Sequence, residues 1–264
     1  MGLQEILNLP LVHKVAIVTG GGTGIGKAIG VNLARNGARV AIASRNPEHL
    51  EAAKTDFKKL GLSVFALPMD QKEEIQRAVA QVADQCGAIH ILVNNAGISG
   101  LSRLDDPEDG KWFNILDTNL SGMYLITKEV LRHIKDHSGG RIINISSVLG
   151  KFGVAGYAAY CTTKHGVIGF TRALALEVVN RGITVNTVCP GWVNTEMARQ
   201  GIDESAAHQG ITPEQFREQA VAGVPIKRFL EPDEIAELVC YLASDLAKGI
   251  TGQAINICGG QTML

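Results

Sequence analysis

The sequence predicts an α/β fold in which helices cover both faces of one parallel sheet, an arrangement called doubly wound. Three observations predict it. Short runs rich in β-branched residues alternate with longer helical segments, the short runs are near-continuously apolar, and a glycine cluster joins the first run to the first helix. Strands buried on both faces lack polar alternation, and strand–helix alternation at this spacing is typical of a doubly wound sheet.

Seven short runs are predicted as the strands of this sheet. Residues 15–19 read VAIVT and residues 40–43 read VAIA, so hardly any polar side chain interrupts them. Runs of this length and composition fit strands that are covered on both faces. In chain order the predicted strands are 15–19, 40–43, 64–68, 89–93, 142–145, 184–188 and 254–257.

Six segments between the strands are predicted as helices, because apolar residues recur in them at spacings of three and four. In chain order they are 24–36, 47–60, 72–86, 108–135, 157–179 and 232–243.

One polar insertion, at about 196–224, interrupts the alternation between the sixth strand and the last helix. Its punctuating residues are Gly201, Gly210, Pro213, Gly223 and Pro225. They indicate separate helical pieces, and an insertion at the carboxyl end of a strand is placed to close over a ligand as a lid. Because no linker, repeat or low-complexity tract divides the chain, we expect a single domain over 1–264.

The composition argues against several classes of function. The 25 basic and 26 acidic residues form no basic block, so neither nucleic acid nor a membrane is expected as a partner. The five cysteines lack CxxC spacing, as reduced core residues do, and the scattered histidines predict no metal site. No signal-peptide pattern and no apolar run of about 18 residues occurs, so we expect a soluble, cytoplasmic protein. No GxSxG elbow surrounds Ser146 or Ser147, which excludes a hydrolase.

The glycine cluster at 19–26, TGGGTGIG, is predicted to bind phosphate. It follows the first strand and opens the first helix, so backbone N–H groups and the positive end of the helix would face a pyrophosphate. The spacing is not GxGxxG, because three residues separate Gly20 from Gly24. The alternative is that these glycines serve only close packing of strand and helix. We assign to the cofactor Gly20, Gly22, Thr23, Gly24, Ile25 and Gly26.

The end of the second strand bears on which dinucleotide binds. An acidic residue there would bond a ribose 2′-hydroxyl and repel a 2′-phosphate, whereas this chain has Ser44, Arg45 and Asn46. A guanidinium and a phosphate form a charge-assisted pair. The sequence therefore favours NADP(H) over NAD(H), the alternative being that Arg45 is merely solvated at the start of a loop.

Tyr160 and Lys164 are the strongest candidates for chemistry. On a helix they lie one above the other, and an ammonium beside a phenol favours phenolate, which predicts a lowered pKa for Tyr160. The alternative is an amphipathic helix face with an extended lysine. Ser147 lies thirteen residues upstream of Tyr160.

Seven motifs follow one another along the chain. They are Thr19-Gly20-x-x-x-Gly24-Ile25-Gly26, Asp70, Asn94-Asn95-Ala96-Gly97, Asn119, Ser147, Tyr160-x-x-x-Lys164 and Pro190-Gly191-x-Val193-x-Thr195. With this ordered set the chain resembles the classical short-chain dehydrogenases/reductases over residues 14–260. The resemblance implies a Rossmann-type domain, a seven-stranded sheet of order 3-2-1-4-5-6-7 and a homotetramer.

The resemblance also implies roles for the candidate catalytic residues. Tyr160 would be the general acid/base, and Ser147 would orient the substrate oxygen. Lys164 would lower the pKa of Tyr160 and hold the nicotinamide ribose. Asn119 would support a water that relays protons. As a ketone is reduced, negative charge grows on its oxygen, and two hydroxyl donors suit that charge. Ser146 competes with Ser147 but would point to the opposite face of the strand. Tyr157 also competes, but Cys161 stands where its lysine would be needed, so we expect Tyr157 to line the pocket or pack.

Further cofactor contacts are implied in the same way. Asp70 and Gln71 would meet the adenine, Asn95, Ala96 and Gly97 the adenosine ribose, and Pro190, Gly191, Val193 and Thr195 the nicotinamide end, with Val193 and Thr195 at its carboxamide. Asn94 would instead bond neighbouring strands.

Within the family, residues 164–171, 183–191 and 256–260 look most like 3-oxoacyl thioester reductases and aromatic polyketide ketoreductases, and similar runs occur in hydroxyacid dehydrogenases. Carrier-protein reductases dock their acidic carrier with two arginines; Arg181 matches one and Ser138 replaces the other, which weighs against a carrier and leaves a coenzyme A ester or a free ketone open. The pocket is expected to use 100–104, 148–154, Trp192, Met197, Ile202 and Phe216.

We therefore predict an NADPH-dependent enzyme that reduces a small carbonyl substrate, a 3-oxoacyl thioester or polyketide-like β-keto compound. Two alternatives stay open. One is an NAD(P)-dependent dehydrogenase of a small alcohol, sugar or hydroxyacid. The other is a protein that senses NADP without turnover, because a fold does not guarantee chemistry.

Overall fold

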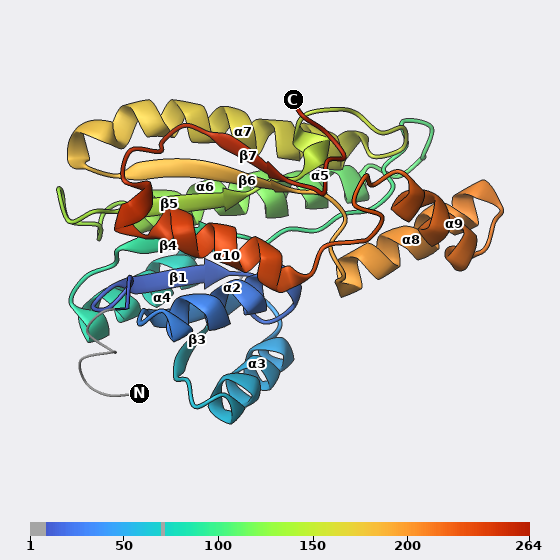
Figure 1. The fold of residues 1–264 in the computed structure, drawn as a ribbon. Coiled ribbons are helices and arrows are strands. Elements are labelled where there is room, and N and C mark those ends of the chain that lie inside the picture. Colours follow the sequence, from blue (N-terminus) through green and yellow to red (C-terminus); the bar gives the residue numbers. More distant parts are fainter. Residues whose placement is uncertain (1–8, 70–71) are drawn as a thin grey trace.

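The computed structural model describes residues 9–69 and 72–264. Its centre is a seven-stranded sheet in the order β3-β2-β1-β4-β5-β6-β7, with every neighbouring pair parallel (Figure 1). The strands are β1 Val15–Thr19, β2 Arg39–Ser44, β3 Val64–Pro68, β4 Ile91–Asn94, β5 Arg141–Ile145, β6 Thr184–Pro190 and β7 Ala254–Ile257. The predicted fold class and strand order are confirmed.

Helices cover both faces of the sheet. They are α2 Gly24–Arg35, α3 Pro47–Lys59, α4 Lys72–Cys86, α5 Gly110–Leu116, α6 Gly122–Val130, α7 Ala158–Val178, α8 Glu196–Gln209, α9 Pro213–Ala222 and α10 Pro232–Ala243. The alternating side chains of β1 show how the two apolar layers form. Ala16 and Val18 pack toward α2, α3 and α10, whereas Val15 and Ile17 pack toward α4, α6 and α7.

The helix predicted over 108–135 is helical from Gly110 to Val130, but it ends earlier than predicted and changes to π geometry in its middle. The structure has α5, then a π-helical segment over Asp117–Ser121, then α6, which ends at Val130. The π segment contains Asn119, whose side chain is bonded outside the helix, to the backbone of Ile98. A π-bulge absorbs one extra residue per turn and is frequent at functional sites, which periodicity in the sequence does not reveal.

The insertion predicted at 196–224 folds as α8 and α9, which lie beyond the carboxyl end of the sheet (Figure 1). Gly210 turns the chain between them with φ +69°, and Thr212 and Gln215 form a capping box at the start of α9.

Helices α8 and α9 are attached differently to the rest of the chain. Among the described residues, polar contacts join α8 to the rest of the chain. Glu204 accepts from the Leu101 amide at 3.2 Å and lies 3.6 Å from the Lys111 ammonium, the Ser205 and Tyr157 hydroxyls lie 2.9 Å apart, and His208 lies 3.0 Å from Arg103.

No residue of α9 is fully buried. This helix is attached through the edge of Phe216 against Trp192 and the guanidinium of Arg217 over the ring of Phe229. Within the part of the chain that the structure describes, no helix is long and apolar enough to cross a membrane.

Candidate active site

Two cavities meet at the carboxyl ends of the strands, where open α/β sheets bind ligands. The larger has a volume of about 780 Å³ and the smaller about 300 Å³. Gly97, Ile145 and Lys164 line both of them. The two cavities therefore share one wall, and Lys164 stands in it.

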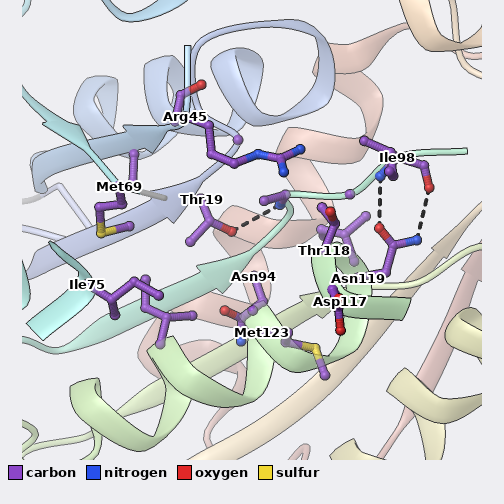
Figure 2. Close-up of a pocket in the computed structure, with 18 of the residues that line it drawn as sticks. Thr19, Arg45, Met69, Ile75, Asn94, Ile98, Asp117, Thr118, Asn119 and Met123 are labelled. Atoms are coloured by element: carbon purple, nitrogen blue, oxygen red, sulfur yellow. Dashed lines mark hydrogen bonds between the residues drawn. The ribbon is translucent and has the colours of Figure 1, made fainter. Parts of the chain in front are cut away.

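The larger cavity collects predicted residues from the glycine loop, the end of β2, the segment after β4, the π segment and α7 (Figure 2). Those residues are Gly20, Ser44, Arg45, Asn46, Ala96, Gly97, Asn119 and Lys164. Arg45 extends over the cavity toward the segment that carries Ile98 (Figure 2). It makes no hydrogen bond or ion pair with any residue that the structure describes.

Ser44 and Asn46 have local duties beside Arg45. The Ser44 hydroxyl accepts from the Asn46 amide at 3.1 Å, and the Asn46 side chain caps α3 by accepting from the amides of Glu48 and His49. These bonds fix the turn after β2 and leave the guanidinium of Arg45 as the charged group free to meet a ligand.

The glycine loop is shaped by close backbone approach. A Cβ on Gly20, where φ is +63°, would lie 2.9 Å from Cα of Ala96, and one on Gly26 would lie 2.2 Å from the Gly20 carbonyl oxygen. Thr23 is the N-cap of α2, yet its side chain caps no amide, so the first amides of the helix keep their donors available. Gly22, Thr23, Gly24 and Gly26 line neither cavity and shape the turn around it.

The segment after β4 is bonded to the glycine loop. The Thr19 hydroxyl accepts from the backbone amides of Asn95 and Ala96, both at 3.0 Å, and the Asn95 side chain donates to the carbonyls of Thr19 and Gly20. Asn94 donates to Asn144 on the neighbouring strand β5 at 2.8 Å, which confirms the expectation that it bonds strands.

The smaller cavity collects further predicted residues. Those named for the cofactor or for catalysis are Ile25, Asn95, Gly97, Ser147, Tyr160, Lys164, Pro190, Gly191, Val193 and Thr195. Those named for the pocket are Leu101, Val148, Leu149, Phe152, Val154, Trp192, Met197 and Phe216. Ile202 was predicted here and instead lines a separate cavity between α8 and α9, and Leu104 is 92 % exposed.

Lys164 and Tyr160 lie side by side on α7. The lysine Nζ lies 5.4 Å from the centre of the Tyr160 ring and donates to the Ile145 carbonyl at 2.9 Å. Burial raises the pKa of Tyr160 to about 12, and a hydrogen bond with Ser147 opposes this effect. Burial also lowers the pKa of Lys164 to about 8.

The prediction of a lowered Tyr160 pKa is therefore wrong for this structure. Desolvation of the phenol outweighs the ammonium, because Nζ points at a carbonyl and lies over the ring. At neutral pH Tyr160 holds its proton and Lys164 is charged, so the pair is poised to donate a proton.

Asn119 holds the shared wall in place. Its amide accepts from the Ile98 N–H at 2.8 Å and donates to the Ile98 carbonyl at 2.9 Å (Figure 2), and it also donates to Thr163 at 3.1 Å. These bonds pin the segment that carries Gly97, beside Lys164.

The competing side chains have other partners. The Ser146 hydroxyl donates to the Lys164 carbonyl at 2.8 Å, whereas the Ser147 oxygen faces Tyr160. Tyr157 lines the smaller cavity and meets Ser205 of α8, as expected of a pocket residue.

Some cavity residues were not predicted. Met69, Ile75 and Met123 form an apolar side of the larger cavity (Figure 2). Met69 directly follows the third strand, and this position at the carboxyl end of a strand was the signal that could have predicted it as a cavity residue. Gln261 lines the smaller cavity, and the glycine pair before it was the available signal. Asp70 and Gln71, predicted to meet the adenine, lie outside the described residues.

Comparison with known proteins shows which family this chain resembles. A family model described as short chain dehydrogenase matches residues 14–205. The chain is 40% identical over 254 residues to a 3-oxoacyl-acyl-carrier-protein reductase of Vibrio harveyi, covering 96% of this chain and 99% of that one. It is 40% identical over 250 residues to the acetoacetyl-CoA reductase of Shinella zoogloeoides, covering 95% and 99%. A crystal structure of an actinorhodin polyketide ketoreductase variant with NADPH superposes with a TM-score of 0.89 at 39% identity, covering 94% and 97%.

Proposed function

Because the chain belongs to the short-chain dehydrogenase family, whose oxidoreductases use NAD(H) or NADP(H), we propose that this ketone reductase uses NADPH and acts on a 3-oxoacyl thioester or similar β-keto compound. One observation carries the proposal. Ser147 and Tyr160 line the smaller cavity together, and Lys164, whose Nζ lies 5.4 Å from the centre of the Tyr160 ring, stands in the wall that this cavity shares with the larger one.

The larger cavity suits NADPH. Arg45 is free there, no carboxylate ends β2, and the crowded Gly20 and Gly26 let the backbone approach a pyrophosphate. Residues proposed to hold the adenosine half are Gly20, Ser44, Arg45, Asn46, Asp70, Gln71, Asn95, Ala96 and Gly97, and those proposed for the nicotinamide half are Ile25, Lys164, Pro190, Gly191, Val193 and Thr195. When bound, NADPH supplies the hydride for the carbonyl carbon.

Tyr160 and Ser147 act on the substrate oxygen. As that oxygen gains negative charge, two hydroxyl donors stabilise it, and Tyr160 then gives up its proton. A pKa of about 12 keeps Tyr160 protonated until this moment. Below pH 8 Lys164 carries a positive charge beside the ring, which stabilises the phenolate left by proton donation.

The walls of the smaller cavity favour an acyl group. Leu149, Phe152, Trp192 and Phe216 give it apolar sides suited to carbon chains or rings. The acetoacetyl-CoA reductase among its relatives supports a coenzyme A ester.

The state of Arg181 weighs against docking of a carrier protein. Its guanidinium is bound to Asp136 at 2.6 Å and to the carbonyls of Leu131 and Ile134, each at 3.0 Å. An arginine with these partners has little capacity left for an acidic protein. We therefore propose a coenzyme A ester ahead of a carrier-bound thioester.

We further propose a cytoplasmic homotetramer of single-domain chains with the lid at about 196–224. Large apolar side chains stay exposed on α6 and α7, where Tyr124 is 47 % and Leu176 79 % exposed, and near the C-terminus, where Met263 is 92 % exposed. Faces of this kind mark interfaces. Light scattering after size-exclusion chromatography tests the assembly.

The central experiment compares the chain with its Tyr160→Phe variant. NADPH oxidation with acetoacetyl-CoA should fall by about 10²- to 10⁴-fold, the usual range for loss of a general acid, while NADPH binding measured by fluorescence stays within about twofold. Unchanged turnover would remove Tyr160 from its role. Binding of NADPH without turnover of any ketone by the unmodified chain would favour a sensor.

A further inference from the structure

The C-terminal segment carries a side chain that the proposed mechanism does not use. Gln261 lines the smaller cavity beside Gly191 and Trp192. Its Oε1 is buried without a hydrogen-bond partner, and its Nε2 donates to none of the residues that the structure describes. Buried amides in folded proteins are normally paired. An unpaired amide in the wall of a catalytic cavity therefore points to a polar group on the ligand.

The turn before Gln261 aims its side chain. Gly259 and Gly260 have φ of +62° and +87°, a conformation that favours glycine. A Cβ on Gly259 would lie 2.5 Å from the Ile226 side chain, and one on Gly260 would lie 3.1 Å from Pro225. The glycine pair thus lets the chain turn tightly beneath the segment that follows α9, and Gln261 enters the cavity from this turn.

The residues around Gln261 hold it in this position. Its own amide donates to the Cys258 carbonyl at 3.2 Å. The Asn256 side chain donates to the carbonyls of Thr262 and Leu264 at 3.3 and 3.2 Å, and Lys151 donates to the Leu264 carbonyl at 2.6 Å. These bonds fix the backbone of the turn and therefore the point from which the Gln261 side chain enters the cavity.

The orientation of the amide selects the kind of partner. Oε1 lies against Gly191, 2.9 Å from where a Cβ would stand, so Nε2 is the end that can meet a ligand. An N–H group requires an acceptor. A β-keto thioester has two acceptors, the ketone oxygen and the thioester oxygen, separated by a single carbon between their carbonyls. The first is the one proposed to bind Ser147 and Tyr160.

We propose that Gln261 donates a hydrogen bond to the second carbonyl of the substrate and so selects 1,3-dicarbonyl compounds over plain ketones. This inference rests on the proposed function and deepens it.

The test compares Gln261→Met with the matched control Gln253→Met, whose glutamine precedes β7 and lines neither cavity. Acetoacetyl-CoA and an unfunctionalised cyclic ketone serve as substrates, with NADPH saturating. Gln261→Met should lower kcat/KM about tenfold for acetoacetyl-CoA, through KM, and less than about threefold for the cyclic ketone. Gln261→Glu, which cannot donate, should lose at least as much. Equal losses on both substrates would overturn the proposal.

A binding measurement separates this proposal from the catalytic one. In the Tyr160→Phe background, with NADPH present, calorimetry should show acetoacetyl-CoA binding about tenfold more weakly when Gln261 is Met, and unchanged affinity would overturn the role of Gln261. If the unmodified chain binds acetoacetyl-CoA through Gln261 but reduces neither substrate, the proposed reduction fails while the hydrogen bond stands.

Discussion

Replacing Arg45 by Ala tests the cofactor assignment directly. Arg45 is exposed, lines the larger cavity and has no partner among the described residues, so its removal breaks no bond within the protein. We therefore expect an unchanged melting temperature. Any loss of NADPH affinity then reports on the contact between the guanidinium and the 2′-phosphate alone.

The size of the effect follows from that exposure. Hydrogen bonds to charged groups contribute about 1.5–3 kcal/mol, and solvent at this position reduces the value to roughly 1–2 kcal/mol. Since 1.4 kcal/mol is a factor of ten, KM for NADPH should rise about 5- to 30-fold. NADH has no 2′-phosphate, so its KM should change by less than about twofold.

The assay measures initial rates with each cofactor at low and at high salt. The difference between the native chain and Arg45→Ala should shrink as salt screens the exposed pair. Arg77→Ala is the matched control, because Arg77 is an exposed residue of α4 that lines neither cavity. Equal losses with NADPH and NADH would refute the reasoning, since the 2′-phosphate would then not be the group that Arg45 recognises.

Two further predictions concern pH and packing. Because burial lowers the pKa of Lys164 to about 8, the lysine is charged below pH 8 and loses its charge above it. We therefore expect kcat/KM for reduction to be level below pH 8 and to fall above it. A level profile up to pH 10 would contradict the role of the ammonium. A Cβ on Gly26 would lie 2.2 Å from the Gly20 carbonyl oxygen, so Gly26→Ala should cost about 1–3 kcal/mol and lower Tm by roughly 2–12 °C. Gly169→Ala, with no atom within 4 Å of the new Cβ, is its control in a thermal melt, and equal Tm values for the two variants would contradict the packing argument.

The sequence was sufficient for the sheet and for many residues that line the two cavities, because the signals there are local. The apolar run at β1 and the glycines after it are contiguous, and Tyr160 and Lys164 are one helical turn apart. The residues that escaped prediction depend on distant contacts. The π-helical segment at Asn119 is bonded to the backbone of Ile98, which lies in the segment after β4.

The pKa of Tyr160 likewise depends on contacts that the sequence does not reveal. Helical spacing predicts that Lys164 lies next to it, but it does not predict that Nζ will turn to the Ile145 carbonyl or that the phenol will be buried. Gln261 escaped because its placement depends on a turn packed beneath the segment after α9. The direction in which a side chain points and the extent of its burial are set by the folded chain. A pattern of residue types in the sequence does not predict them.

The unequal attachment of α8 and α9 has a consequence for how a substrate enters. Helix α8 buries two apolar side chains, Ile202 and Ala206, and its other attachments, at Glu204, Ser205 and His208, are polar and can exchange their partners for water at small net cost. The strands are held by buried apolar layers that cannot. Local opening therefore has its lowest free energy at α8 and α9. Amide hydrogens of α8 and α9 would exchange with solvent long before those of β1 or β5, and each substrate could be admitted by a fluctuation that leaves the catalytic wall intact.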